Sequence, residues 1–332
     1  MRITKPSYFD QFHCLANLCP DSCCQEWDVQ VDPKSAAFYR SLPGSLGKRL
    51  RQVMYTEDGE VYMTIEDRRC PMWRDDGLCR IQAKLGHDAL CKTCREFPRL
   101  THDYGDFVEL GLELSCPEAA RLILTAEDAQ ATISHAPGGD APEYDAAAME
   151  VLLRTRSTAL SLLSNPTFSP NEVLALLLYY GYQAQAELDG EDTPDFVPND
   201  ILSQAKQMAQ EGDAGALIRF FTGLEILTPR WAAQLNAPAA PMPWKAEFRK
   251  LARYFVERYW LQAVSDYDLI SRVKFCVISC LLIRNLGGEL AETAQCYSKE
   301  IENDADNVDS LLDAAYTYEA FTDIHLLGLL LK

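Results

Sequence analysis

Short alternation of apolar and polar residues marks the first third of the chain. Three stretches have the period of two that half-buried strands show, and they cover residues 27–32, 61–65 and 107–114. Residues 57–60, an acidic stretch with one glycine, predict a turn before the second of them. Pro33 predicts the first turn of a helix with Asp32 as its N-cap, and another helix is expected over residues 117–124. We therefore expect mixed, irregular structure in this region.

The remainder of the chain has the 3.6-residue period of helices. A Gly- and Pro-rich stretch at residues 134–142 predicts a loop between the two regions. Helical segments are expected at residues 144–163, 171–188, 200–210, 215–227, 244–263, 266–286, 288–303 and 308–331. The predicted fold is mainly α. A small irregular α+β, cysteine-rich, metal-binding domain (residues 1–133) is followed by an all-helical bundle or solenoid-like domain (residues 143–332).

Composition and charge narrow the classes of partner. The 332 residues are 48% hydrophobic and 24% charged, and the formal net charge is −18. Residues 1–125 carry 16 Lys and Arg against 19 Asp and Glu, whereas the rest carries 15 against 30. An acidic chain without a basic stripe argues against nucleic acid and anionic membrane as partners. The acidic helical part suits a lysine-bearing protein partner, and equally a solvated surface that keeps the protein soluble.

The apolar runs are too short for a membrane span, which needs about 18 consecutive apolar residues. The first residues also lack the apolar core of a secretory signal peptide. We therefore expect a cytoplasmic protein whose thiols stay reduced. In that compartment, clustered cysteines indicate metal ligands more readily than disulfides.

Twelve cysteines are present, and nine of them fall in the first 116 residues. The nine candidate metal ligands are Cys14, Cys19, Cys23, Cys24, Cys70, Cys79, Cys91, Cys94 and Cys116. Soft thiolates select zinc or iron–sulfur clusters, and both alternatives fit the count. The histidines lack a zinc-finger spacing, and Cys70 and Cys116 are each followed by proline as in some ferredoxin ligand runs, which favours iron–sulfur.

The other three cysteines are expected to be core residues. Cys276 and Cys280 lie four residues apart in a strongly apolar helical segment, so they share one helix face. Cys296 lies in the next helical segment. Free cysteine behaves as a small apolar side chain when buried, and no function is needed to explain these three.

The first region closely resembles the flagellin lysine-N-methylase family of bacteria. That family belongs to a wider zinc- or iron-chelating group whose cysteine motif ends in Cys-Cys. The resemblance covers about residues 8–125, and its matching stretches are residues 12–32, 70–73, 76–82, 85–87, 90–99 and 114–124. It implies an iron–sulfur protein, with a 4Fe-4S cluster, that transfers methyl groups from S-adenosylmethionine to lysine side chains of flagellin. The implied class is therefore a protein lysine N-methyltransferase, and flagellin or another lysine-bearing protein is the implied partner.

The S-adenosylmethionine site itself has no recognisable motif. A glycine-rich Rossmann turn and the Cys-x3-Cys-x2-Cys spacing of radical enzymes are both missing from the sequence. Arg95 and Arg99, in the matched segments, are candidates to hold the methionine carboxylate, and the alternative explanation, which is preferred, is surface or sulfur-shell packing. Trp27 and Trp73 flank candidate ligands and are expected to form a hydrophobic shell.

A target lysine must lose its proton before methylation, because its reference pKa is near 10.4. Asp28, Asp32 and Glu113 are the candidate proton acceptors, and for Asp32 the role of helix cap is preferred. The alternative to the enzyme is a protein-binding or redox module. Such a module would be stabilised by zinc or an iron–sulfur cluster and would have no methyltransferase activity.

Overall fold

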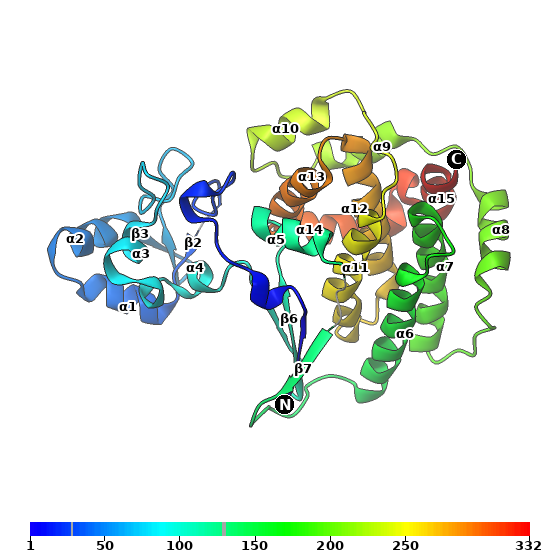
Figure 1. Ribbon diagram of the computed structural model, residues 1–332, viewed down its shortest axis with the longest axis horizontal. Coiled ribbons are helices and arrows are strands. Elements are labelled where there is room, and N and C mark those ends of the chain that lie inside the picture. Colours follow the sequence, from blue (N-terminus) through cyan, green and yellow to red (C-terminus); the bar gives the residue numbers. More distant parts are fainter. Residues whose placement is uncertain (28, 128–130) are drawn as a thin grey trace.

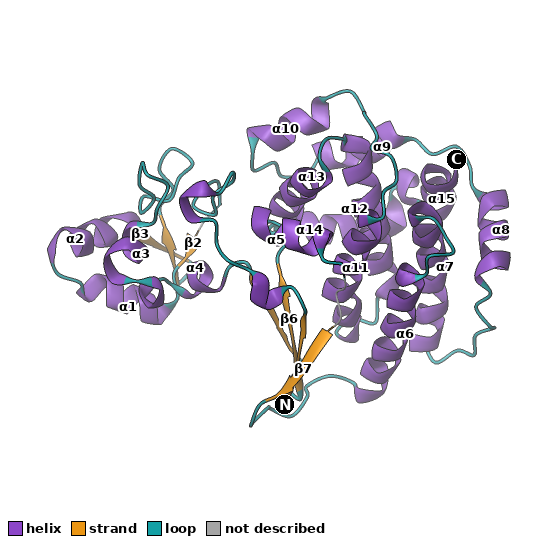
Figure 2. Ribbon diagram, viewed as in Figure 1, coloured by secondary structure: helices purple, strands orange, loops and turns teal. Residues whose placement is uncertain are grey.

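A computed structural model describes residues 1–27, 29–127 and 131–332 of the chain. A small lobe, a narrow sheet and a large helical part follow one another along the longest axis (Figure 1). Figure 2 shows the strands gathered in two places, inside the small lobe and in the sheet that leads to the helices. The prediction of a mainly α fold with a small α+β N-terminal region is confirmed.

The small lobe packs helices around a three-stranded antiparallel sheet of order β2-β4-β3. Its elements are α1 (Pro33–Ser41), α2 (Gly44–Val53), α3 (Arg80–Leu85), α4 (Lys92–Glu96), β2 (Val29–Gln30), β3 (Met54–Glu57) and β4 (Glu60–Met63). Tyr39 and Leu50 are fully buried between the helices and the sheet. Glu57 pairs with Glu60, so the predicted turn is confirmed as the β3–β4 hairpin. The predicted strand at 27–32 is short, and residue 28 lies outside the described residues.

A four-stranded sheet connects the lobe to the helical part. Its strands are β1 (Arg2–Pro6), β5 (Arg99–Asp103), β6 (Phe107–Leu112) and β7 (Ala131–His135), in the order β5-β6-β1-β7. The first residues of the chain run parallel to β6 and antiparallel to β7. The Arg156 guanidinium binds both oxygens of Glu109 at 2.6 and 2.7 Å, which ties the sheet to a helix.

The helical part is a bundle around one central helix. Its helices are α5 (Pro117–Thr125), α6 (Ala146–Ser164), α7 (Pro170–Leu188), α8 (Pro198–Met208), α9 (Ala214–Thr222), α10 (Pro229–Asn236), α11 (Glu247–Tyr259), α12 (Leu269–Leu286), α13 (Leu290–Tyr297), α14 (Ala305–Thr317) and α15 (Asp323–Leu331). Helix α12 is buried on all sides, as expected for a helix at the centre of a core. It contacts α7, α11, α13 and α14, whereas the units of a solenoid contact only their neighbours.

Three helical predictions differ from the structure. The segment expected at 308–331 is two helices, because the chain leaves the helix at Tyr318 and makes a 3-10 turn over Glu319–Phe321. Helix α9 ends at Thr222, and α10 was not anticipated. Helix α13 ends in a π-helical turn over Ser298–Glu302. The described helices include none with the length and apolar character of a membrane span.

Candidate metal centre

Seven of the nine N-terminal cysteines meet at one cavity of about 300 Å³ between the small lobe and the helical part. They are Cys14, Cys19, Cys23, Cys24, Cys79, Cys94 and Cys116. The remaining two, Cys70 and Cys91, are buried next to it in the core of the lobe. All nine are free thiols. Groups that are up to about a hundred residues apart in sequence are therefore brought together by the fold.

Two sets of thiols can be distinguished by what they pack against. One set belongs to the apolar core of the small lobe and comprises Cys24, Cys70, Cys79, Cys91 and Cys94. In the other set, Cys116 packs in the helical core, while Cys14 and Cys19 lie on the N-terminal segment that crosses the cavity. The boundary between the two sets of thiols falls between two adjacent residues. Cys24 packs against the lobe core, whereas Cys23 is exposed.

Local backbone structure fixes several of these thiols. The carbonyl of Cys24 accepts a hydrogen bond from the N–H of Cys70 at 2.8 Å, which joins two sequence groups. Cys91 is the N-cap of α4 and Cys94 lies in its first turn, so both thiols face the same end of that short helix. Gly77 has a φ of +79°, and a Cβ atom at this position would lie 3.1 Å from the Asn17 backbone, so a side chain there would be strained and crowded.

Burial keeps most of these thiols protonated. It raises the pKa of Cys70 to about 12 and that of Cys116 to about 11. A hydrogen bond from Cys23 lowers the pKa of Cys24, and one from Cys94 lowers that of Cys91. Because metals bind the thiolate form, a metal ion or cluster would displace protons from this group.

The helical part contributes a buried lysine that the sequence analysis did not single out. The side chain of Lys299 is 3% exposed and lines the cavity. Its Nζ atom lies 2.8 Å from Asp21 Oδ1, 3.4 Å from Glu26 Oε2 and 5.2 Å from the ring centroid of Trp27. The π-helical turn carries Lys299, and such turns are frequent at functional sites. The sequence signal was no more than a charged residue inside a segment predicted to be helical.

Both predicted arginines line the same cavity. Arg95 donates to the carbonyl of Leu90 at 3.2 Å, and the guanidinium of Arg99 lies 5.1 Å from the ring centroid of Phe12. Since Lys299 is already ion-paired with Asp21 and Glu26, these two guanidinium groups are what make the cavity attractive to an anionic group. Their role in binding a cofactor stays a prediction.

The three candidate proton acceptors are placed differently. Asp28 lies outside the described residues. Asp32 is a helix cap, as preferred: Oδ1 accepts from the N–H of Ser35 at 3.0 Å and Oδ2 from the N–H of Lys92 at 2.8 Å. Partial burial opposes ionisation of Asp32, but these hydrogen bonds outweigh it and lower its pKa to about 2. Burial raises the pKa of Glu113. A catalytic role stays a prediction for all three.

A second cavity of about 250 Å³ shares a wall with the first. The shared wall consists of Cys23, Trp27, Cys94 and Phe97. The second cavity is further lined by Val29, Thr93, Glu113 and Asn303. Of the candidate proton acceptors that the structure describes, Glu113 alone lines either cavity.

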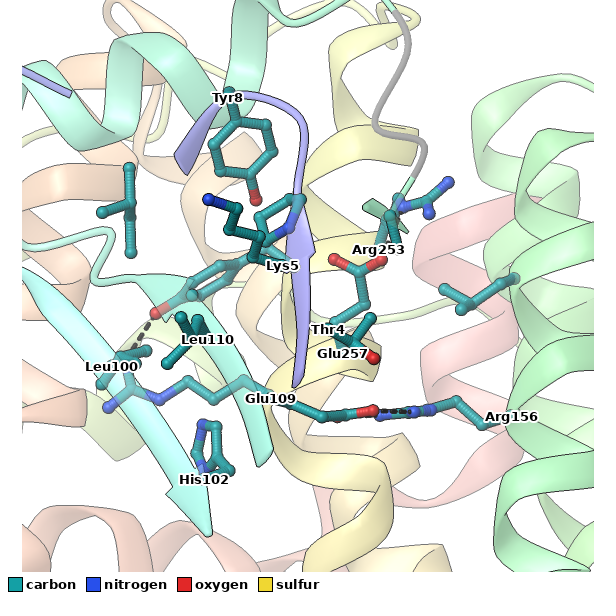
Figure 3. A pocket seen from close by; sticks show the side chains of 17 residues that line it. Thr4, Lys5, Tyr8, Leu100, His102, Glu109, Leu110, Arg156, Arg253 and Glu257 are labelled. Atoms are coloured by element: carbon teal, nitrogen blue, oxygen red, sulfur yellow. Dashed lines mark hydrogen bonds and ion pairs between the residues drawn. The ribbon is translucent and has the colours of Figure 1, made fainter. Parts of the chain in front are cut away.

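A third cavity, of about 160 Å³, lies between the connecting sheet and helices α6 and α11. Figure 3 shows Arg156 reaching across it to Glu109, with Lys5 and His102 nearby. Glu257 is paired with Arg253 at 2.8 Å. Because these carboxylates are already neutralised by arginines, the cavity has the character of a sheet–helix interface.

The donor set fits a thiolate-ligated metal group. Several cysteine thiols converge on one cavity, and soft sulfur ligands suit zinc and iron–sulfur clusters alike. Within the described ranges of the chain, no three His, Cys, Asp or Glu side chains are already arranged as ligands of one ion. Both metal alternatives stay open.

Comparison with known proteins gives the family. The chain is 30% identical over 194 residues to the lysine-N-methylases of Salmonella typhimurium and Salmonella choleraesuis, a match that covers 55% of this chain and 47% of each relative. It therefore spans about half the length of these curated relatives. No family model and no solved structure matches the chain. It is also 32% identical over 136 residues to the flagellar biosynthetic protein FliU of Salmonella muenchen, a match that covers 39% of this chain and 80% of FliU. On this evidence the chain belongs to the family of the flagellin lysine-N-methylases and FliU.

Proposed function

We propose that this protein is an iron–sulfur-dependent lysine N-methyltransferase that uses S-adenosylmethionine to methylate lysines of flagellin or another lysine-bearing protein. The names of its relatives support lysine methylation in general. The observation that carries the finer proposal is the cavity in which seven cysteines meet Arg95, Arg99 and Lys299. Thiols there would hold the metal group, and the two arginine side chains favour an anionic cofactor group next to it.

In this proposal, different residues of the cavity have different roles. An iron–sulfur cluster with an open iron would supply a Lewis acid for the amino and carboxylate groups of the methionine moiety. Arg95 and Arg99 provide guanidinium groups for the same carboxylate. Trp27, Phe12 and Phe97 line the cavity with apolar surface, which excludes water and strengthens the charge interactions inside.

The transfer itself requires a neutral lysine amine. Its lone pair forms the new N–C bond while the C–S bond of the sulfonium breaks and leaves its electron pair on sulfur. The products are S-adenosylhomocysteine and a methylated lysine. The proton that the lysine loses needs an acceptor, and Glu113 is suited to this because burial raises the pKa of its carboxyl.

Anaerobic purification followed by counts of iron, zinc and sulfide tests the metal group. Titration with S-adenosylmethionine and mass spectrometry of flagellin after incubation then test binding and methyl transfer. We expect iron and sulfide in equal amounts, binding, and a mass gain of one or more methyl groups. The Cys280→Ala variant, which alters a core thiol far from the cavity lining, should behave like the wild type. Stoichiometric zinc without sulfide would overturn the cluster.

A redox or protein-binding module is the second candidate function. The observation that favours it is the hydrogen bonding within two close thiol pairs, Cys23 with Cys24 and Cys91 with Cys94, since paired thiols with one lowered pKa resemble redox sites. Loss of both cofactor binding and methylated product, together with a reversible, reductant-dependent thiol count, would favour this function over methylation.

A further inference from the structure

The second cavity has apolar walls that hold a fixed shape. The rings of Trp27 and Phe97 meet edge to face with their centroids 5.4 Å apart. The indole N–H of Trp27 donates to the carbonyl of Cys23 at 2.8 Å, which holds the ring in place. Val29 extends the apolar surface, while Thr93 and Asn303 are exposed at the cavity. The cavity is thus apolar along its walls and reachable from solvent.

Its one charged group among the described lining residues is a carboxylate. Glu113 Oε2 accepts from the Ser115 hydroxyl at 3.1 Å. Arg258 acts electrostatically on the same carboxylate, but among the described residues the Ser115 hydroxyl is the only side-chain donor to it, so Oε1 is available to a ligand. Glu113 follows β6 directly, and its own N–H donates to the carbonyl of Pro98 at 2.7 Å, which fixes its backbone.

The two neighbouring cavities have opposite charge. The first is lined by Arg95, Arg99 and the ion pair of Lys299 with Asp21, so basic groups exceed acidic ones among its described lining residues, whereas the described lining of the second contains Glu113 and no basic residue. The Lys299 ammonium lies over the Trp27 ring and lines the first cavity only. An anionic group is therefore favoured on one side of the shared wall and a cationic group on the other.

We propose that the second cavity binds the lysine side chain of the protein substrate, with its aliphatic stem against Trp27 and Phe97 and its nitrogen at Glu113 Oε1. This inference rests on the proposed function, which assigns the methyl donor to the first cavity. A lysine stem packs well on aromatic surface while its head group binds a carboxylate. The cavity is lined by residues of both the small lobe and the helical part, so a protein surface docked there would touch both.

Peptide binding to the full chain tests the inference independently of turnover. The probe is a fluorescent peptide with one internal lysine, compared with the same peptide in which norleucine replaces that lysine and removes only the amine. Fluorescence anisotropy should show about tenfold tighter binding of the lysine peptide, because a charge-assisted hydrogen bond is lost with norleucine. Glu113→Gln should raise the Kd of the lysine peptide about tenfold and leave that of the norleucine peptide unchanged.

A second variant and a control variant distinguish a loss of lysine binding from misfolding of the protein. Asn303→Arg places a positive charge at an exposed position of the same cavity and should weaken binding of the lysine peptide only. Glu57→Gln removes an exposed carboxylate in the β3–β4 hairpin and should change neither Kd. Circular dichroism of each variant confirms that it is folded.

The outcomes separate this inference from the proposed function. Equal Kd values for the two peptides with the wild type, or an unchanged lysine-peptide Kd in both variants, would overturn the inference, even if flagellin is methylated. Lysine-specific binding that depends on Glu113, without methyl transfer to flagellin, would overturn the proposed function and leave the inference standing.

Discussion

The small lobe and the helical part use the same residue type in opposite ways. In the helical part, Cys276, Cys280 and Cys296 are buried among apolar side chains, as predicted. In the lobe, Cys70 and Cys91 are equally buried, yet they adjoin a cavity lined by further thiols and by charged side chains. Burial alone therefore does not reveal the role of a cysteine; the neighbours of the thiol do.

The two regions also differ in how much core supports them. The apolar cluster of the lobe contains twelve buried residues, two of which are cysteines, whereas the helical core extends over most of α6 to α15. Small cores seldom give enough stability alone and usually need a disulfide or a metal. We therefore expect the lobe, but not the helical part, to depend on the proposed metal group for its stability.

Among the tests of this difference between the lobe and the helical part, metal removal should have the largest effect. A strong chelator, applied without oxygen, is expected to unfold the lobe, because the binding free energy of a structural metal is largely folding free energy, of the order of 10 kcal/mol for thiolate sites. Hydrogen exchange with mass spectrometry should show lost protection in α1, α2 and β4. Amides of α12 in the same sample should stay protected and so serve as the internal control.

Two results would contradict that expectation. Unchanged protection of the lobe after complete metal loss would show that its apolar core suffices. Simultaneous loss of protection in α12 would show that the two regions unfold as one unit, in which case the contrast between them is not energetic.

The junction between the two regions provides the second test. Lys299→Met keeps most of the side-chain volume but leaves Asp21 and Glu26 without their buried partner. Removing one member of a buried ion pair costs about 3 kcal/mol or more. Urea unfolding followed by tryptophan fluorescence should show this loss. Since Asp21 lies between Cys19 and Cys23, the variant should also lose metal faster than the wild type.

A matched control uses an exposed pair in the helical part. Lys206 binds Glu172 at 2.9 Å, and its side chain is 52% exposed. Lys206→Met should therefore cost less than about 1 kcal/mol and leave metal retention unchanged. Equal costs for the two lysine variants would mean that the contact between Lys299 and the cysteine loop is not specific.

The sequence predicted those features that local patterns determine. The Asp32 cap, the 57–60 turn and the long helices with strong periodicity and caps are confirmed. Strands β1, β5 and β7 were missed because they are short and partly polar; β7 is exposed along its whole length. The break at Tyr318 was missed because no glycine or proline marks it.

The sequence predicted which residue type forms the candidate site but not how these residues are arranged, and metal binding by the thiols stays a prediction. Clustered cysteines indicated a metal centre, and the fold brings seven of them to one cavity. Lys299 and Asn303 reach the two cavities from the far end of the chain through tertiary packing, which no local pattern encodes. The difference between Cys23 and Cys24 likewise depends on tertiary packing, since Cys24 packs against the lobe core and Cys23 is exposed.

The smallest expected effect comes from comparing two helix caps. Asp32→Ala removes acceptors for two backbone N–H groups, at α1 and α4, and should cost about 1–2 kcal/mol at pH 7. The carboxyl has a pKa of about 2 in the folded protein, below its unfolded value near 3.9. Its added stability is therefore complete above pH 4 and is lost as the pH falls through 2, so wild type and variant should converge there in urea unfolding.

Asp145 is the matched cap in the helical part, since its carboxylate also accepts from two backbone N–H groups, those of Ala147 and Ala148. Asp145→Ala should cost a similar amount of stability. Only Asp32→Ala should also speed metal loss, because Asp32 holds the first turn of the helix that carries Cys91 and Cys94. If both variants release metal at the wild-type rate, that helix does not need its cap to present the thiols, and the lobe is stiffer than its small core implies.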